Sequence, residues 1–105
     1  MQIAMAVRAC IRMIEEETGQ TIDVMSLSYN RLMNHIRYMV ARSIKGEKLK
    51  LNMNDYMSIK FPKSYAMAVE VCRQLEVQLH RNSPLDEVEI GYLAMHIERV
   101  VMDKE

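Results

Sequence analysis

Apolar residues recur at every third or fourth position through most of the chain, which is the spacing of one face of an amphipathic helix. Five segments show this pattern, separated by capping or breaking residues, and they cover approximately residues 3–17, 27–45, 55–60, 63–80 and 84–101. Each segment is apolar on one side only, so each needs partners to cover that side. The pattern therefore predicts an all-α protein: a compact bundle of about five helices, made of two antiparallel helix pairs and one short helix.

The ends of the first two helices carry residues that favour helix termini. Gly19 and Gly46 follow the two apolar patterns, and glycine readily adopts the left-handed conformation that ends a helix. Ser26 or Ser28 is expected to cap the start of the second helix through its hydroxyl group. The stretch 46–53 alternates weakly and is too short and isolated to support a sheet, so we expect a loop.

The last three helices are delimited in the same way. Asn54 or Asp55 is expected to cap the short helix. Pro62 should end it and begin the next, because the residue before a proline avoids the helical region. Ser83 is expected to cap the last helix, with Pro84 at its first position. The first turn of that helix would then hold acidic residues, which suit the positive end of the helix dipole: Asp86, Glu87 and Glu89.

Length and composition fit one domain that covers residues 1–105. The chain is 50% hydrophobic and has only three Gly and two Pro, so it can bury a core without disulfides or metal. No apolar run approaches the roughly 18 residues that span a bilayer, so no membrane segment is expected. Cys10 and Cys72 lie inside helical apolar patterns, without a CxxC motif or a secretory signal. This favours reduced thiols in a cytoplasmic protein over a disulfide in a secreted one.

The formal net charge is zero, but the charges are unevenly distributed along the chain. Residues 31–63 carry eight basic and two acidic groups, whereas residues 64–105 carry four basic and eight acidic groups. The basic middle third could face nucleic acid, an anionic protein or a phosphate, or it could simply be solvated. Its basic residues are interrupted by Met, Leu and Ile rather than by exposed aromatic residues or a recognised motif, so a helical nucleic-acid-binding module is the weaker interpretation.

Two histidines lie inside the apolar patterns of long helices, where a polar side chain needs a reason. His96 lies in the most apolar part of the last helix, three residues before Arg99. His35 lies in the second helix, with Arg31 and Arg42 on the same side. Such an imidazole is nucleophilic near neutral pH and can take a phosphoryl group, whose oxygens a nearby arginine can hold bidentately. The pattern also fits histidines that are merely hydrogen-bonded core residues.

Ordinary enzyme chemistry finds little support in the sequence. There is no HExxH, CxxC or glycine-rich phosphate loop, and neither cysteine lies near a histidine in sequence. His80 is expected at the end of the fourth helix, where a histidine suits the helix dipole. We therefore expect a protein that is not an enzyme and that holds no metal or cofactor.

Three blocks of the sequence carry a resemblance to a known family. They are NHIRYMVAR at 34–42, FPKSYAMA at 61–68 and PLDEVEIGYLAMHI at 84–97. In order and spacing they resemble the phosphotransferase-system regulation domain (PRD) of the BglG-type transcriptional antiterminators. The resemblance runs from about residue 5 to residue 103.

The resemblance implies a cytoplasmic five-helix bundle, commonly a homodimer, in which two histidines accept phosphate from the sugar phosphotransferase relay. The donor is HPr or a sugar-specific enzyme II B component. In such proteins the phosphorylation state sets how two regulation domains pair, which controls an RNA-binding or DNA-binding domain elsewhere in the chain. This chain would then be one domain taken from a longer regulator of sugar-utilisation genes. Which sugar is sensed, and whether phosphate activates or inhibits, stays open.

Carried over by residue, His35 and His96 match the two phosphoacceptor positions, and Arg42 matches the arginine seven residues after the first of them. Arg99 and Asn34 are the other residues expected beside the phosphate. Asn34 departs from first copies of the domain in tandem proteins, which tend to have Asp there, so the chain resembles a second copy. The alternatives are the same type of domain from a DNA-binding or sigma-dependent activator, and a purely structural interaction module.

Overall fold

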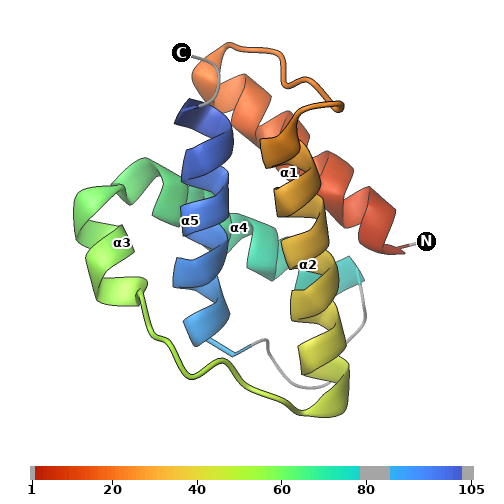
Figure 1. The fold of residues 1–105 in the computed structure, drawn as a ribbon, viewed down its shortest axis with the longest axis vertical. Coiled ribbons are helices and arrows are strands. Elements are labelled where there is room, and N and C mark those ends of the chain that lie inside the picture. The colour runs from red at the N-terminus through yellow and green to blue at the C-terminus, as the bar shows by residue number, and fades with distance from the viewer. Residues whose placement is uncertain (1, 79–85, 103–105) are drawn as a thin grey trace.

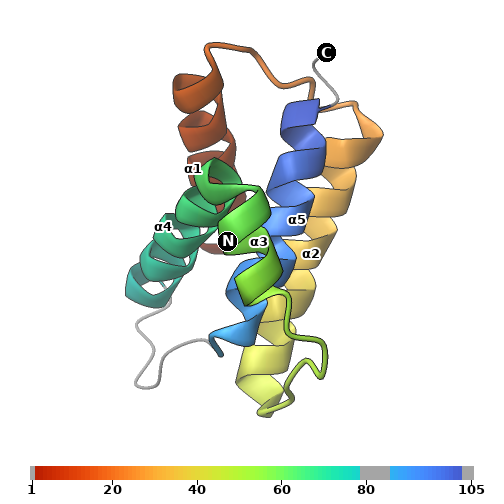
Figure 2. The same ribbon diagram turned by 90° about the vertical axis from the view of Figure 1, so that its left-hand side faces the viewer.

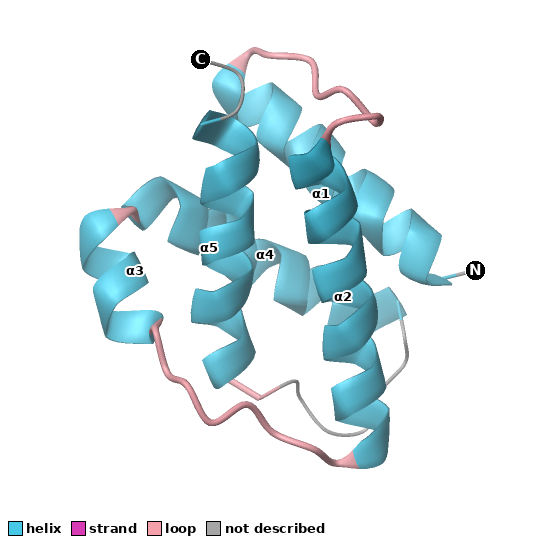
Figure 3. Ribbon diagram, viewed as in Figure 1, coloured by secondary structure: helices cyan, strands magenta, loops and turns pink. Residues whose placement is uncertain are grey.

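The computed structural model describes residues 2–78 and 86–102, and within these ranges the chain forms five helices and no strand (Figure 3). The helices are α1 (Gln2–Thr18), α2 (Leu27–Lys45), α3 (Asn54–Lys60), α4 (Pro62–Gln78) and α5 (Val88–Met102). The predicted all-α fold class is therefore confirmed. None of the helices in the described ranges is long and apolar enough to cross a membrane.

The helices pack as two antiparallel pairs. In Figure 1, α2 and α5 lie side by side and run in opposite directions, and Figure 2 shows α1 and α4 on the other side of the molecule. The short helix α3 lies beside α4 and α5 and covers the open edge between them. The expected two pairs and one short helix are thus α2 with α5, α1 with α4, and α3.

A single apolar core joins all five helices. Burying one large apolar side chain contributes roughly 1.5–3 kcal/mol, so a set of this size is the main source of stability. The largest side chains that are almost fully buried are Ile14, Leu32, Ile36, Met39, Met57, Leu75, Leu93 and Ile97. Cys10 and Cys72 are free thiols within the same core, and burial raises the pKa of each to about 12, so they behave as small apolar residues.

The ends of α1 and α2 follow the sequence pattern. Gly19 and Gly46 have φ angles of 70° and 77°, in the left-handed region that ends a helix. Ser26 caps α2: its Oγ accepts a hydrogen bond from the backbone N–H of Tyr29 at 3.1 Å. Ser28, the other candidate, lies inside the helix.

One expected cap is wrong, and the last helix begins later than expected. Helix α3 begins at Asn54 and has no side-chain cap. The Asn54 amide bonds to α5 instead, because its Oδ1 accepts from the N–H of Gly91 at 2.8 Å and its Nδ2 donates to the carbonyl of Glu87 at 2.9 Å. Helix α5 begins at Val88, so Asp86 and Glu87 precede its first turn, and Asp86 Oδ1 accepts from the N–H of Val88 at 3.1 Å. The caps and ends predicted at His80, Ser83 and Pro84 lie outside the described residues.

Gly91 is the point at which α5 comes closest to the start of α3. A Cβ atom placed on Gly91 would lie 2.5 Å from Asn54 Oδ1, 2.7 Å from the backbone nitrogen of Asn54 and 2.8 Å from the carbonyl carbon of Met53. Since two of these atoms belong to the backbone, they could not move away cheaply. Glycine is therefore needed here for space rather than for an unusual backbone angle.

Replacing Gly91 by alanine should lower the free energy of unfolding by about 2 kcal/mol, because the added methyl group overpacks the contact. Helix propensity alone predicts the opposite sign, since alanine is about 1 kcal/mol more favourable than glycine inside a helix. Urea denaturation followed by circular dichroism measures the difference. Adding Asn54→Ala should not restore stability, because the backbone atoms remain. A Gly91→Ala variant at least as stable as the wild type would contradict the close approach.

Candidate functional site

The two histidines singled out in the sequence lie face to face. His35 comes from α2 and His96 from α5, and their ring centroids are 4.5 Å apart with an angle of 23° between the ring planes. The antiparallel packing of α2 and α5 brings these residues together although 61 positions separate them in the chain. The two candidate positions therefore form one site rather than two.

Tyr92 completes a cluster of three rings. It lies one turn before His96 on α5, and its ring meets His35 edge-on, with centroids 4.6 Å apart and an angle of 66°. It is tilted against His96 at 5.2 Å. Sequence analysis missed Tyr92 as part of the site, although its spacing of four residues from His96 is the signal that would have found it.

An open cavity of about 250 Å³ lies over the ring cluster. His35 is only 5% exposed, and its Nε2 is the one buried side-chain nitrogen or oxygen of the described residues that lacks a hydrogen-bond partner. His96 is half-buried. The residues that line the cavity come from α2 and α5 alone: Arg31, Asn34, His35, Tyr38, Arg42, Tyr92 and His96.

Both imidazoles are neutral at physiological pH. Burial, followed by the nearby His96 and Arg42, lowers the pKa of His35 from 6.5 to about 3. Burial, followed by Arg99 and Arg31, lowers the pKa of His96 to about 4. A positive charge on either ring is disfavoured by low solvent access and by the surrounding arginines. Each ring therefore keeps a nitrogen lone pair that can act as a nucleophile.

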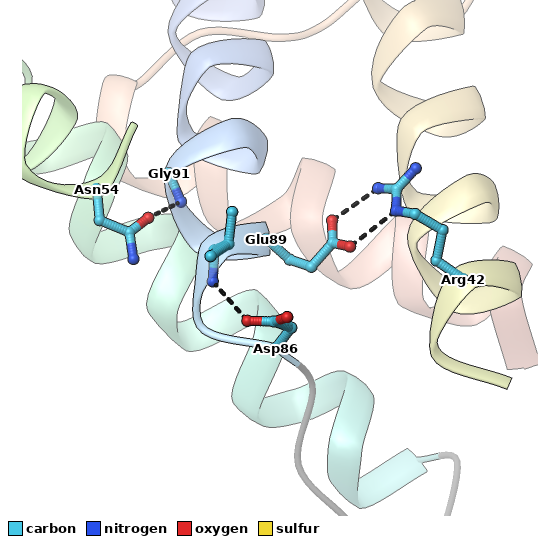
Figure 4. Close-up of polar contacts among 6 residues, drawn as sticks. Arg42, Asn54, Asp86, Glu89 and Gly91 are labelled. Carbon is cyan, nitrogen blue, oxygen red and sulfur yellow. Dashed lines mark hydrogen bonds and ion pairs between the residues drawn. The ribbon is translucent and has the colours of Figure 1, made fainter. Parts of the chain in front are cut away.

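Arg42 is bound to a buried carboxylate. Its Nε donates to Glu89 Oε2 at 2.8 Å and its Nη2 donates to Oε1 at 2.7 Å, as Figure 4 shows. The side chain of Glu89 is 3% exposed and that of Arg42 is 19% exposed. The hydrogen bonds to Glu89 are the main reason that the pKa of Arg42 is raised above its ordinary value. Glu89, expected only as a first-turn acid that suits the helix dipole, is thus the partner of a cavity residue.

Of the other two expected residues, Asn34 lines the cavity and Arg99 does not. Asn34 is exposed and lines the cavity. Arg99 is exposed on α5 and lies outside the cavity lining, but it acts electrostatically on His96. Arg31, which the sequence placed on the same side of the helix as His35, lines the cavity, and so does Tyr38, which the sequence did not single out.

In the described ranges, no group of three or more His, Cys, Asp or Glu side chains could hold a metal ion. Two neutral imidazoles beside two arginines suit an anionic group instead.

The fold and the site define a small helical domain built around a paired-histidine cavity. The model of the PRD domain family matches residues 8–100, so the chain belongs to the PRD domain family, the regulation domain of BglG-type antiterminators. No solved structure matches the chain.

Among the similar proteins is Protein GlcT of Staphylococcus haemolyticus (strain JCSC1435), 32% identical over 89 residues, which are 83% of this chain and 31% of that protein. The GlcA/glcB genes antiterminator of Staphylococcus carnosus (strain TM300) is 28% identical over 97 residues, 90% of this chain and 33% of that protein. Protein GlcT of Staphylococcus aureus (strain Newman) is 29% identical over 90 residues, 83% of this chain and 31% of that protein. The chain thus spans about a third of the length of the relatives it matches.

The buried imidazole of His35 should make the fold less stable as the pH falls. Its pKa of about 3 in the folded state lies below the ordinary 6.5, so the unfolded chain binds the proton first. The stabilisation is complete above pH 6.5 and is lost as the pH falls from 6.5 toward 3. Between pH 7 and pH 5 this group alone should lower the free energy of unfolding by about 2 kcal/mol.

Urea titrations of the wild type and of His35→Gln at the two pH values test this expectation. Glutamine cannot take up the proton, so the wild type should lose about 2 kcal/mol more than the variant. Equal losses in the two proteins would show that His35 is not a buried neutral group.

Breaking the pair formed by Arg42 and Glu89 should cost more than removing it completely. Arg42→Met leaves a carboxylate buried without its counter-charge, and we expect a loss of about 3 kcal/mol at pH 7. The double variant Arg42→Met, Glu89→Met removes both charges and should recover part of that loss. A double variant whose loss equals the sum of the two single losses would mean that the pair is not energetically coupled.

Proposed function

We propose that this chain is the regulatory domain of a bacterial transcriptional antiterminator of sugar-utilisation genes, and that it is reversibly phosphorylated on histidine by the phosphotransferase system. The observation that carries the proposal is the pair of stacked imidazoles of His35 and His96 in an arginine-lined cavity. Membership of the PRD domain family supports it, as does the similarity to a protein named GlcA/glcB genes antiterminator. That name favours antitermination over the alternative of a DNA-binding or sigma-dependent activator.

The proposed step is a phosphoryl transfer from the phosphohistidine of HPr. A lone pair on a neutral ring nitrogen of His35 or His96 attacks phosphorus and forms a new N–P bond. The N–P bond of the donor breaks, and the donor nitrogen keeps the electron pair. The lowered pKa values of both histidines support this role, since a protonated ring nitrogen has no lone pair to give. An enzyme II B component is the alternative donor.

The bound phosphate would change the charge of the cavity. A phosphoryl group adds roughly 1.5 to 2 negative charges near pH 7, by analogy with other phosphorylated side chains. Arg31 and Arg42 line the same cavity and supply the positive charges to receive it. The phosphoryl group would therefore neutralise most of the positive charge of the two arginines without the arrival of any other ligand.

We further propose that phosphate controls the pairing of two copies of the domain. Helix α2, which carries His35, also exposes Leu27 and Tyr38, each 63% exposed and three turns apart on one side of the helix. An apolar pair of this kind beside the phosphate site suits contact with a second copy. A charge change in the cavity would alter that contact and so act on a nucleic-acid-binding domain carried elsewhere in a longer cytoplasmic protein.

Phosphorylation is tested with radiolabelled phosphoenolpyruvate, enzyme I and HPr. The wild type should gain an acid-labile label, and the double variant His35→Ala, His96→Ala should gain none. His80→Ala is the matched control, since it removes the third histidine of the sequence and should label as the wild type does. The two single variants identify the acceptor. A double variant that labels like the wild type would refute the assignment.

Analytical ultracentrifugation of the labelled and unlabelled domain tests the second part. We expect the dissociation constant of the dimer to change by at least about tenfold, equivalent to roughly 1.4 kcal/mol, when phosphate is added. A dissociation constant that stays the same in the two states would leave phosphorylation without an effect on pairing.

A further inference from the structure

We propose that Glu89 is a positioning residue for the phosphate site: it holds Arg42 so that the free edge of the guanidinium faces a phosphoryl group on the histidine pair. The inference rests on the proposed function and adds a residue that neither touches the histidines nor lines the cavity.

The hydrogen bonds of Arg42 leave one edge of its guanidinium group unused. A guanidinium has five N–H groups and can form two-pronged contacts along more than one edge. Nε and Nη2 contact Glu89, whereas Nη1 points away from it, toward the N-terminal part of α2 (Figure 4). His35 lies in that direction, two turns earlier on the same helix, and it lines the cavity together with Arg42. The edge formed by Nη1 and Nη2 is therefore available to phosphate oxygens.

Glu89 is itself held in place. Both carboxylate oxygens are occupied by Arg42, and the side chain is almost fully buried, so moving it would expose or unpair a buried charge. Its helix turn is fixed at two further points, where Asn54 accepts from the N–H of Gly91 and Asp86 accepts from the N–H of Val88. The first turn of α5 is thus a rigid base for the arginine.

This arrangement has a thermodynamic consequence for phosphate binding. A free arginine loses side-chain entropy when it is fixed in one position. Because Glu89 has already fixed Arg42 in the fold, phosphate does not have to meet that cost again. Arg42 also does not have to leave Glu89 in order to present Nη1, so the carboxylate orients the arginine rather than competing for it.

The test measures the phosphoryl equilibrium between HPr and the domain. Purified phospho-HPr is mixed with wild type, Glu89→Gln or Arg42→Lys, and the ratio of labelled domain to labelled HPr is read at equilibrium, together with the half-life of the label. Both variants should lower the ratio about tenfold: Glu89→Gln loses one of the two prongs that hold Arg42, and Arg42→Lys replaces the forked guanidinium by a single ammonium group.

Ser64→Ala is the matched control for a merely structural effect. Ser64 is buried and donates from Oγ to Glu98 Oε1 at 2.7 Å, so the variant also removes a hydrogen bond to a carboxylate of α5. It leaves Arg42 untouched and should keep the ratio of the wild type. All ratios are taken at a temperature at which urea titration shows each protein folded. Should Glu89→Gln fail to fold, Glu89→Asp keeps the negative charge but draws the carboxylate back from Arg42, and the ratio should fall in the same way.

The outcomes separate the two proposals. If the wild type takes no label, both the proposed function and this inference are wrong. A wild type that labels, with variants that give the same ratio, leaves the proposed function standing and overturns the role of Glu89. A ratio that rises in Glu89→Gln also overturns it, because the carboxylate would then be competing with phosphate for Arg42.

Discussion

The packing of α2 against α5 is the contact on which the rest of the site depends. Each histidine of the pair precedes an isoleucine, Ile36 or Ile97, that is completely buried in the core. These side chains fix the two helices lengthwise, because interiors are close-packed and do not tolerate sliding. A slip of one helical turn moves a residue by about 5.4 Å, which is more than the 4.5 Å that separates the two imidazole rings. The geometry of the polar site is therefore set by the apolar core beneath it.

The dependence of the site on helix packing also explains which features could be predicted from the sequence. Helix number and position could be predicted because apolar spacing and the glycines at 19 and 46 are local signals. The start of α3 could not, because the side chain of Asn54 bonds to residues more than thirty positions away. A local pattern gives that residue a capping role that the tertiary structure overrides.

The site could be predicted in part for a similar reason. His35, His96 and Arg42 stood out because a polar side chain within an apolar helical pattern is unusual, and the family resemblance reinforced them. That the two rings stack depends on which helices pair and in which register, and no local pattern encodes this. Glu89 does lie in the first turn of α5, as predicted, but its pairing with Arg42 was missed, because a place in the first turn offers an explanation that is complete without a distant partner.

The lowered pKa values of the two imidazoles also limit which events can change the charge of the cavity. An ordinary histidine changes its charge between pH 5 and 8 and so reports the acidity of its surroundings. With pKa values of about 3 for His35 and about 4 for His96, neither ring gains a proton over that range. The cavity is consequently insensitive to ordinary fluctuations in acidity, and its charge can be altered there only by a group that arrives covalently or as a ligand. A histidine pair buried in this way does not respond to the changes in pH that alter the charge of an ordinary histidine.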